Sequence, residues 1–384
     1  MQTTAAFTGF RDPFSGEEFA PTVERHPDGG ILDPAYALDS IGLSRDQASA
    51  SDAFDVLMPI PASERVQLAG GPTPLVDCPR LADELGVESV YIKDEGANPT
   101  GSITDRGIAL AISAARQHGA TDVGLASTGA GGQSAAAFGA RAGLTTHAYV
   151  PSRTPFQHKA MINVHGGDMN VVGGRFDDAK ATFETESAEL YPLGAFETPF
   201  RHEGAKQVAF ECFQQLNWTV PDVVCYPFVG SAPLYGMAKG AREFAELGLV
   251  DTVPSFYAGQ SKDCAPLVEA FESGATAVEP WDVPDTVAGA LERPAPAGSE
   301  LVLETLREHN GGAVAVNDDD ILESAVTIAS HEGIDISVAG GAAAAMAWEL
   351  REEFSADDTL VLVNPASGAP DADLLRSHLM GQGI

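Results

Sequence analysis

The chain has 384 residues, of which 44% are hydrophobic, so it can bury one large core or, at the usual size of domains, two. Its 55 Asp and Glu outnumber its 22 Lys and Arg, which gives a formal net charge of −33 at pH 7. A surface of this sign repels phosphate backbones, so nucleic acid is excluded as an expected partner.

The acidic residues are spread along the chain and are not gathered in a tail, and only 6 of the 22 basic residues are Lys. This pattern is typical of a protein adapted to a salty cytosol, where molar salt shortens the Debye length to a few Å and screens the repulsion. An ordinary acidic enzyme is the alternative. We therefore expect a halophilic protein that loses structure when salt is removed.

The cysteines stand far apart without a CxxC pair, so the sequence predicts neither a zinc cage nor a disulfide framework; they are Cys78, Cys212, Cys225 and Cys264. The N-terminus lacks a basic region followed by an apolar run, and no stretch reaches the roughly 18–20 apolar residues that span a bilayer. We expect a soluble, cytoplasmic protein with no membrane partner.

Residues 1–60 are rich in Pro, Gly, Asp and Ser and predict an irregular leader without its own core, ending in a linker around residues 49–54. From Gly71 onward, strand and helix patterns alternate, which predicts an α/β fold of parallel sheets covered by helices. The runs expected to form buried strands are 90–92, 123–126, 147–150, 223–226 and 359–363.

Helical patterns lie between these strands. One helix is expected after Ser102, whose side chain would cap it while Asp105 completes a capping box. A second follows the turn STGAGG and ends at Gly143. A third spans residues 317–332, where the run Asp318–Asp320 suits a helix N-terminus, although a cation site is the alternative.

Five segments resemble threonine synthases and related fold-type-II pyridoxal-phosphate enzymes, and the acidity resembles that of haloarchaeal members. The segments are KDEGANPTGSITDRG (93–107), ASTGAGGQSAAAFGARAG (126–143), PSRTPFQHKAMINVHGGDMNVVGG (151–174), GSAPLYGMAKGAREF (230–244) and HEGIDISVAGGAAAAMAWEL (331–350). The resemblance implies two three-layer α/β domains of the tryptophan synthase β-like architecture with the cofactor clamped between them. It assigns 61–107 plus 207–384 to a large domain and 108–206 to a small one.

The first segment departs from the family pattern KDEGxNPTGSFKDRG at the lysine that holds the cofactor. Thr104 stands at that position. A hydroxyl cannot condense with the cofactor's aldehyde as an amine does, and it has no ionisation near neutral pH with which to move protons. The sequence therefore predicts no catalytic residue at this position and no covalent cofactor; a sequence artefact at this position stays open.

Three further cofactor contacts implied by the resemblance are altered. Ala130 replaces an Asn of the family's SGN turn, and Val229–Pro233 replaces a glycine-rich phosphate cup, leaving Gly230 and Ser231 as the remaining donors. Near the C-terminus a gapless match places Pro365 where the family has a hydroxyl residue, although a shift of two would let Ser367 serve. Any residual cofactor contact is expected from Ala130, Gly230, Ser231 and Ser367.

The turn before the second helix keeps its ability to bind an anion. Its backbone amides and the helix dipole suit a small carboxylate, which the resemblance also places there; the residues are Ser127, Thr128, Gly129, Gly131 and Gln133. The alternative is that the glycines only make a strand-to-helix turn.

Two further candidates are a second lysine and a pair of histidines. Lys93 is an amine eleven residues before Thr104, but the resemblance matches it to a lysine outside the attachment position. His158 and His165 are spaced for one helix face, yet no third ligand lies near in sequence, so no metal site is expected.

Three hypotheses follow. The first is a catalytically degenerate threonine-synthase-like protein without cofactor, which binds a small carboxylate or phosphate or a partner protein, as a homodimer or as the companion of an active paralogue. The second is an active lyase or threonine synthase, converting O-phosphohomoserine to threonine, that holds pyridoxal phosphate non-covalently. The third is a cofactor-independent enzyme in the same cleft. The first accounts for all four altered contacts.

Overall fold

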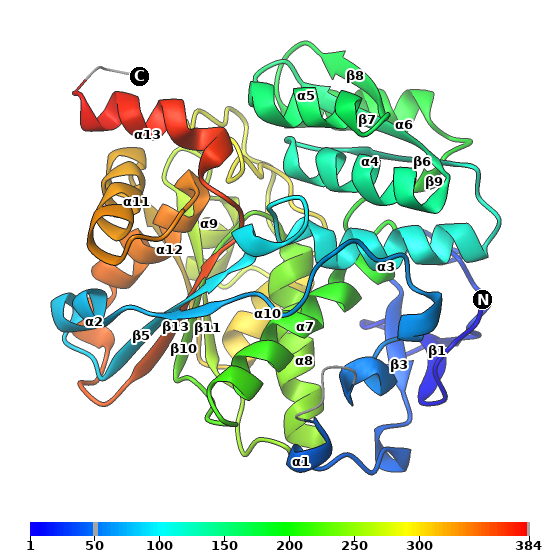
Figure 1. Ribbon diagram of the computed structural model, residues 1–384, viewed down its shortest axis with the longest axis horizontal. Coiled ribbons are helices and arrows are strands. Elements are labelled where there is room, and N and C mark those ends of the chain that lie inside the picture. Colours follow the sequence, from blue (N-terminus) through cyan, green and yellow to red (C-terminus); the bar gives the residue numbers. More distant parts are fainter. Residues whose placement is uncertain (49–52, 382–384) are drawn as a thin grey trace.

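The computed structural model describes residues 1–48 and 53–381, so residues 49–52 of the expected linker lie outside the described residues. Its strands form three sheets, of six, four and three strands (Figure 1). The two larger sheets are mainly parallel, which confirms the predicted α/β class.

The six-stranded sheet gathers strands from both ends of the sequence. Its order is β12 (Gly312–Val316), β11 (Ser255–Ser261), β10 (Val223–Pro227), β13 (Thr359–Asn364), β5 (Ser89–Asp94) and β4 (Leu75–Asp77), and only β4 runs antiparallel to its neighbour. The predicted strands at 90–92, 223–226 and 359–363 all lie in this sheet.

Alternating side chains of these strands enter two separate cores. Cys225 and Leu362 pack beneath α2 (Pro79–Leu85), α11 (Asp318–Glu332) and α12 (Val338–Glu349). Val224 and Val361 pack beneath α7 (Phe200–Gln215), α8 (Ser231–Glu246), α9 (Pro266–Glu272) and α10 (Ser299–Glu308). The period of two along each strand therefore makes the unit three-layered, with helices on both faces (Figure 1).

The four-stranded sheet is parallel throughout and lies above the first in Figure 1. Its order is β8 (Asp168–Val172), β7 (Thr145–Pro151), β6 (Asp122–Ala126) and β9 (Tyr191–Pro192). The helices α3 (Thr104–Gln117), α4 (Ala130–Ala142), α5 (Phe156–Val164) and α6 (Phe176–Glu186) accompany it. The exact residue limits of the two domains stay a prediction.

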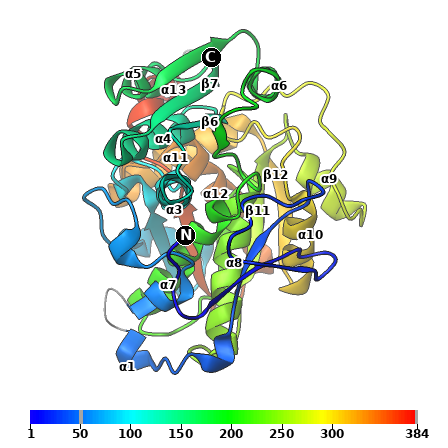
Figure 2. The same cartoon turned by 90° about the vertical axis from the view of Figure 1, so that its right-hand side faces the viewer.

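The leader is not irregular throughout, contrary to expectation. Strands β1 (Phe7–Arg11), β2 (Glu18–Phe19) and β3 (Asp33–Tyr36) form a small antiparallel sheet, which packs against α3 and α7 and is drawn in dark blue in Figure 2. The strand β1 was not predicted, because only Phe7 and Phe10 of this strand enter the hydrophobic core and their spacing does not alternate. As expected, the leader has no core of its own, since these rings share one with α3 and with Phe200 of α7.

The start of α3 also differs from the predicted capping box. Ser102 Oγ accepts a hydrogen bond from the Thr104 amide at 3.2 Å, but Asp105 turns away from Ser102 and accepts from the amide and hydroxyl of Thr100. Asp105 therefore fixes the preceding loop, and Thr104 is the first residue of the helix. The remaining helices are α1 (Arg45–Ala48) and α13 (Ala372–Leu379).

Candidate ligand cleft

A cavity of about 1240 Å³ lies between the two larger sheets. The loops that follow β6, β7, β10 and β13 border it, so it stands at the carboxyl ends of parallel strands, where α/β proteins bind ligands. Eight of the predicted site residues line it: Thr104, Ser127, Thr128, Ala130, Gly131, Gly230, Ser231 and Ser367. Gly129 and Gln133 lie behind this wall, and whether any of the ten binds a ligand stays a prediction.

Thr104 points its hydroxyl at the loop before α3. Thr104 Oγ1 lies 3.1 Å from Ser102 Oγ, so the hydroxyl is engaged within its own turn. Lys93 does not replace the missing amine, because its ammonium is buried and donates to Glu211, at 2.7 Å, and to the carbonyl of Thr73, at 2.8 Å. Among the described residues, Lys180 of α6 is the lysine that lines the cavity.

The turn at 127–132 presents free backbone donors to the cavity. Ser127 Oγ, which precedes α4, accepts from the amides of Gly129 and Gly132, both at 3.0 Å, and so holds the turn against the first turn of the helix. Among the described residues no protein acceptor faces the amides of Thr128, Ala130 and Gly131. Three amides at a helix N-terminus are suited to an anion.

The start of α8 is a second place with unused donors. The amides of Gly230 and Ser231 lack a protein acceptor within the described chain, and the Ser231 hydroxyl is buried without a partner. Pro233 has no amide to add. A methyl group built on Gly230 would meet only Arg293 Nε, at 3.9 Å, so the space before this helix is open except for that side chain.

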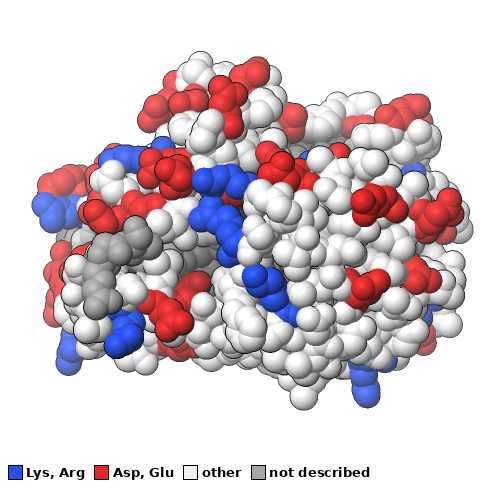
Figure 3. All heavy atoms as spheres, turned by 90° about the horizontal axis from the view of Figure 1, so that it is seen from above, with Lys and Arg blue, Asp and Glu red and all other residues white. Residues whose placement is uncertain are grey.

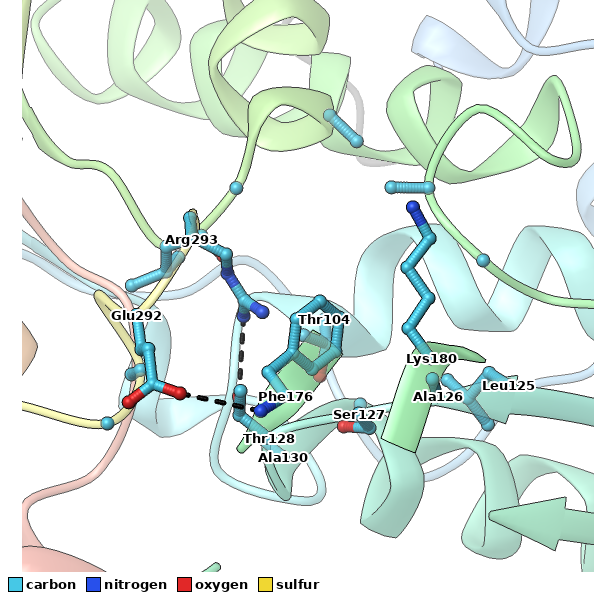
Figure 4. Close-up of a pocket in the computed structure, with 18 of the residues that line it drawn as sticks. Thr104, Leu125, Ala126, Ser127, Thr128, Ala130, Phe176, Lys180, Glu292 and Arg293 are labelled. Atoms are coloured by element: carbon cyan, nitrogen blue, oxygen red, sulfur yellow. Dashed lines mark hydrogen bonds between the residues drawn. The ribbon is translucent and has the colours of Figure 1, made fainter. Parts of the chain in front are cut away.

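Arg293 is the residue of the cleft that the sequence analysis missed. Its Nε donates to the carbonyl of Val229 at 2.8 Å, and its Nη2 donates to Thr128 Oγ1 at 3.3 Å. Its guanidinium lies 4.9 Å from the centre of the Phe176 ring (Figure 4). Burial lowers the pKa of Arg293, but from so high a starting value that the group keeps its charge at neutral pH. The positively charged guanidinium therefore lies between the N-termini of α4 and α8 and contacts the loop before each helix.

The segment that carries Arg293 is a long connection between α9 and α10, residues 273–298. Glu292, which is buried, accepts from Arg153 at 2.6 Å and from Arg175 at 2.8 Å, and both arginines belong to the four-stranded unit. Asp318 accepts from the Thr286 hydroxyl and the Val287 amide. The first acid of the Asp318–Asp320 run thus anchors this connection, beyond serving the N-terminus of α11.

A connection of this length without a helix or strand is unusual in a compact domain and is often functional. That length was the signal in the sequence that could have pointed to Arg293. The run WDVPDTVAGALERPAPAG has no periodicity from which the position of a single arginine could be deduced.

The loop after β13 offers less than expected. Ser367 Oγ donates to Asp335 at 2.7 Å and accepts from the Ala369 amide at 3.2 Å. Pro365 offers only its carbonyl, which accepts from the Ile103 amide at 2.8 Å. Neither residue keeps a free donor for a ligand.

One group of possible metal ligands occurs among the described residues, away from the cavity, and it consists of Asp33, His202 and Glu203. Lys239 Nζ already donates to Asp33 and Glu203, at 2.8 Å each, so an ammonium supplies the positive charge there. His158 and His165 belong to no such group within the described residues. The cluster's role is to bind β3 of the leader to α7 and α8.

Comparison with known proteins gives the class. Residues 66–366 match the family described as pyridoxal-phosphate dependent enzyme, and the chain belongs to this family. It is similar to the threonine synthase of Methanosarcina acetivorans, with 33% identity over 343 residues, 87% of this chain and 84% of the relative. The threonine synthase of Methanocaldococcus jannaschii is 35% identical over 316 residues, 81% and 78% of the two chains.

Solved structures support the fold. A fungal L-serine ammonia-lyase from Rhizomucor miehei aligns with a TM-score of 0.70 and 20% identity, covering 82% of this chain and 99% of that one. A threonine deaminase from Solanum lycopersicum aligns with a TM-score of 0.68 and 21% identity, covering 81% and 84%. The predicted fold-type-II, tryptophan synthase β-like architecture is thereby confirmed. Every helix in the described part of the chain is too short or too polar to cross a membrane.

The cavity fits one part of the family's cofactor and not the other. The free amides and Arg293 suit a phosphate or carboxylate group. The cofactor's aldehyde, by contrast, needs an amine, and Thr104 offers a hydroxyl already engaged with Ser102. The residues present suit an anion and do not suit a covalently held aldehyde.

Proposed function

We propose that this protein is a catalytically degenerate relative of threonine synthase that binds a small carboxylate or phosphate in its cleft. The observation that carries the proposal is the place of Arg293. Its guanidinium touches the loop before α8 through Val229 and the turn before α4 through Thr128, so one charge serves both sets of free amides. Charge-assisted hydrogen bonds of this kind are about twice as strong as neutral ones.

The residue at position 104 argues against the family's covalent chemistry. Thr104 has no nitrogen nucleophile and no proton to exchange near neutral pH. Lys180, the lysine lining the cavity among the described residues, lies within 3.8 Å of Glu184 one turn further along α6. Lys180 is therefore engaged in an ion pair on its own helix and stands elsewhere in the sequence than the family's attachment lysine.

The test uses the purified full-length protein with pyridoxal phosphate, followed by borohydride reduction and peptide mass spectrometry. We expect no pyridoxyl adduct on any lysine. An adduct on Lys180 would overturn the proposal. Calorimetry with inorganic phosphate and with propionate tests the positive claim, and binding of neither ion would refute it.

The second hypothesis, an enzyme that holds pyridoxal phosphate non-covalently, is supported by the free donors of Gly230 and Ser231 beside Arg293. Thr104→Lys separates the two. If the wild-type cleft already accepts the whole cofactor, the added amine should capture it and produce visible absorbance. We expect little absorbance, because Arg293 spans the space between the two loops.

The oligomeric state is also a proposal. Homodimer formation, or pairing with an active paralogue, would explain why a degenerate fold is kept. Light scattering on the purified chain, alone and mixed with an active threonine synthase from the same cells, distinguishes these possibilities. A monomer in both samples would refute them.

A further inference from the structure

His158 of α5 lines the cavity directly behind the turn at 127–132. A methyl group built on Gly129 would stand 2.7 Å from His158 Cδ2 and 3.0 Å from Cγ, so the imidazole ring rests against the backbone of that turn. Because Gly129 also has a φ of +141°, neither space nor conformation admits a side chain there. The ring and the turn are therefore in direct contact.

A chain of two hydrogen bonds sets which ring nitrogen of His158 carries the proton. Gln133 Nε2 lies 3.1 Å from the carbonyl of Thr100, and a carbonyl can only accept, so the amide nitrogen must face it. Gln133 Oε1 then faces His158 Nδ1, at 2.8 Å. An amide oxygen can only accept, so the Nδ1 atom donates and the Nε2 atom carries a lone pair.

The Nε2 atom is available to a ligand. It has no hydrogen-bond partner among the described residues and it is not buried, so solvent reaches it, and His158 is one of the residues that line the cavity. Burial lowers the pKa of His158 to about 4, so the ring is neutral at physiological pH.

We infer that His158 determines specificity by accepting a hydrogen bond from a ligand whose anionic group lies on the turn at 127–132. The inference rests on the proposed function. Nε2 is bonded to Cδ2, the ring carbon that rests against Gly129, so it lies close to the turn at 127–132. A bare anion would face the lone pair, whereas an N–H or O–H next to the anionic group would satisfy it. The cleft therefore selects carboxylates with an adjacent hydrogen-bond donor.

A matched set of three-carbon acids tests this on the wild-type protein by calorimetry. L-Lactate and L-alanine carry a donor next to the carboxylate, pyruvate carries an acceptor, and propionate carries neither. One neutral hydrogen bond corresponds to a preference of about three- to ten-fold. We expect lactate and alanine to bind more tightly than propionate by this factor, and pyruvate to bind no better than propionate.

Two variants separate specificity from a structural role. His158→Phe keeps a ring against Gly129 and should bring lactate down to the affinity of propionate, while propionate itself stays within about two-fold. Gln133→Leu removes the acceptor that holds the proton on Nδ1, so Nε2 can carry the proton and donate it to a ligand. The affinity for pyruvate should then rise relative to the affinity for lactate. His165→Phe, at the end of the same helix and outside the cavity, is the matched control and should change neither ratio.

The outcomes are distinct. If neither propionate nor phosphate binds the wild-type protein, both the proposed function and the inference about His158 fail. If propionate binds but lactate and alanine show no advantage, the inference about His158 fails and the proposed function stands. The wild-type series needs no variant, so a misfolded mutant cannot obscure the result.

Discussion

A single arginine changes what the cleft can hold. Arg293 is half-buried at the wall of the cavity, and a guanidinium partly withdrawn from water is costly unless acceptors surround it. Its protein acceptors are the Val229 carbonyl and the Thr128 hydroxyl, both neutral. A bound anion would complete its surroundings, which is the electrostatic reason to expect one.

Arg293→Leu therefore should weaken the binding of inorganic phosphate or propionate. A hydrogen bond to a charged group contributes about 1.5–3 kcal/mol, so the loss should be roughly ten- to 150-fold. Calorimetry measures it, with Arg351→Leu on the exposed surface as the matched control. Equal affinities of the Arg293 and Arg351 variants would contradict the role assigned to Arg293.

At the scale of elements, the connection 273–298 acts as a fixed bridge although it has no helix or strand. Glu292 binds it to Arg153 and Arg175 of the four-stranded unit, and Asp318 binds it to α11 of the six-stranded unit. These side-chain acceptors replace the backbone ladder that a regular element would have. Contacts to both units therefore position the segment that carries Arg293.

Glu292→Gln should loosen this bridge. The substitution leaves two partly exposed arginines without their shared carboxylate, which we expect to cost about 1–3 kcal/mol of unfolding free energy. Urea denaturation measures the loss, and hydrogen exchange should report faster exchange in 273–298. Glu308→Gln removes an exposed carboxylate 3.9 Å from Arg242 and should cost less than about 0.5 kcal/mol. A Glu292 variant as stable as the Glu308 variant, with unchanged exchange, would show that the bridge is held by other contacts.

For the whole molecule, charge sets the conditions of stability. Acidic side chains are scattered over the face in Figure 3, while some basic side chains form a line near its centre and others stand singly toward its edges. With a net charge of −33, the folded chain repels itself over distances that molar salt reduces to about 3 Å.

The melting temperature should therefore rise between 0.1 M and 3 M potassium chloride, by on the order of 10 °C, which corresponds to roughly 8 kcal/mol for a chain of this size. Potassium chloride is the right salt, because sulfate stabilises proteins by exclusion regardless of charge. Circular dichroism at each concentration measures the shift. A melting temperature that stays constant over this range would count against halophilic adaptation.

Much of the fold could be predicted from local pattern. The strands at 123–126 and 359–363 were found because buried parallel strands are short, continuous apolar runs. The strand β1 was missed, because two phenylalanines over five residues do not distinguish a strand from an irregular segment. The capping box failed because Asp105 had a better partner in Thr100, which local spacing does not reveal.

The sequence by itself determined what cannot happen at residue 104, because the absence of an amine is a property of the residue and no fold can supply one. It also determined the α/β class, since the alternation of apolar periods is a local signal. Only the tertiary structure decided that Arg293 lies between two helix N-termini and that Gln133 fixes the tautomer of His158. These relations join residues that are 165 and 25 positions apart, and their geometry comes from packing, which no local pattern encodes.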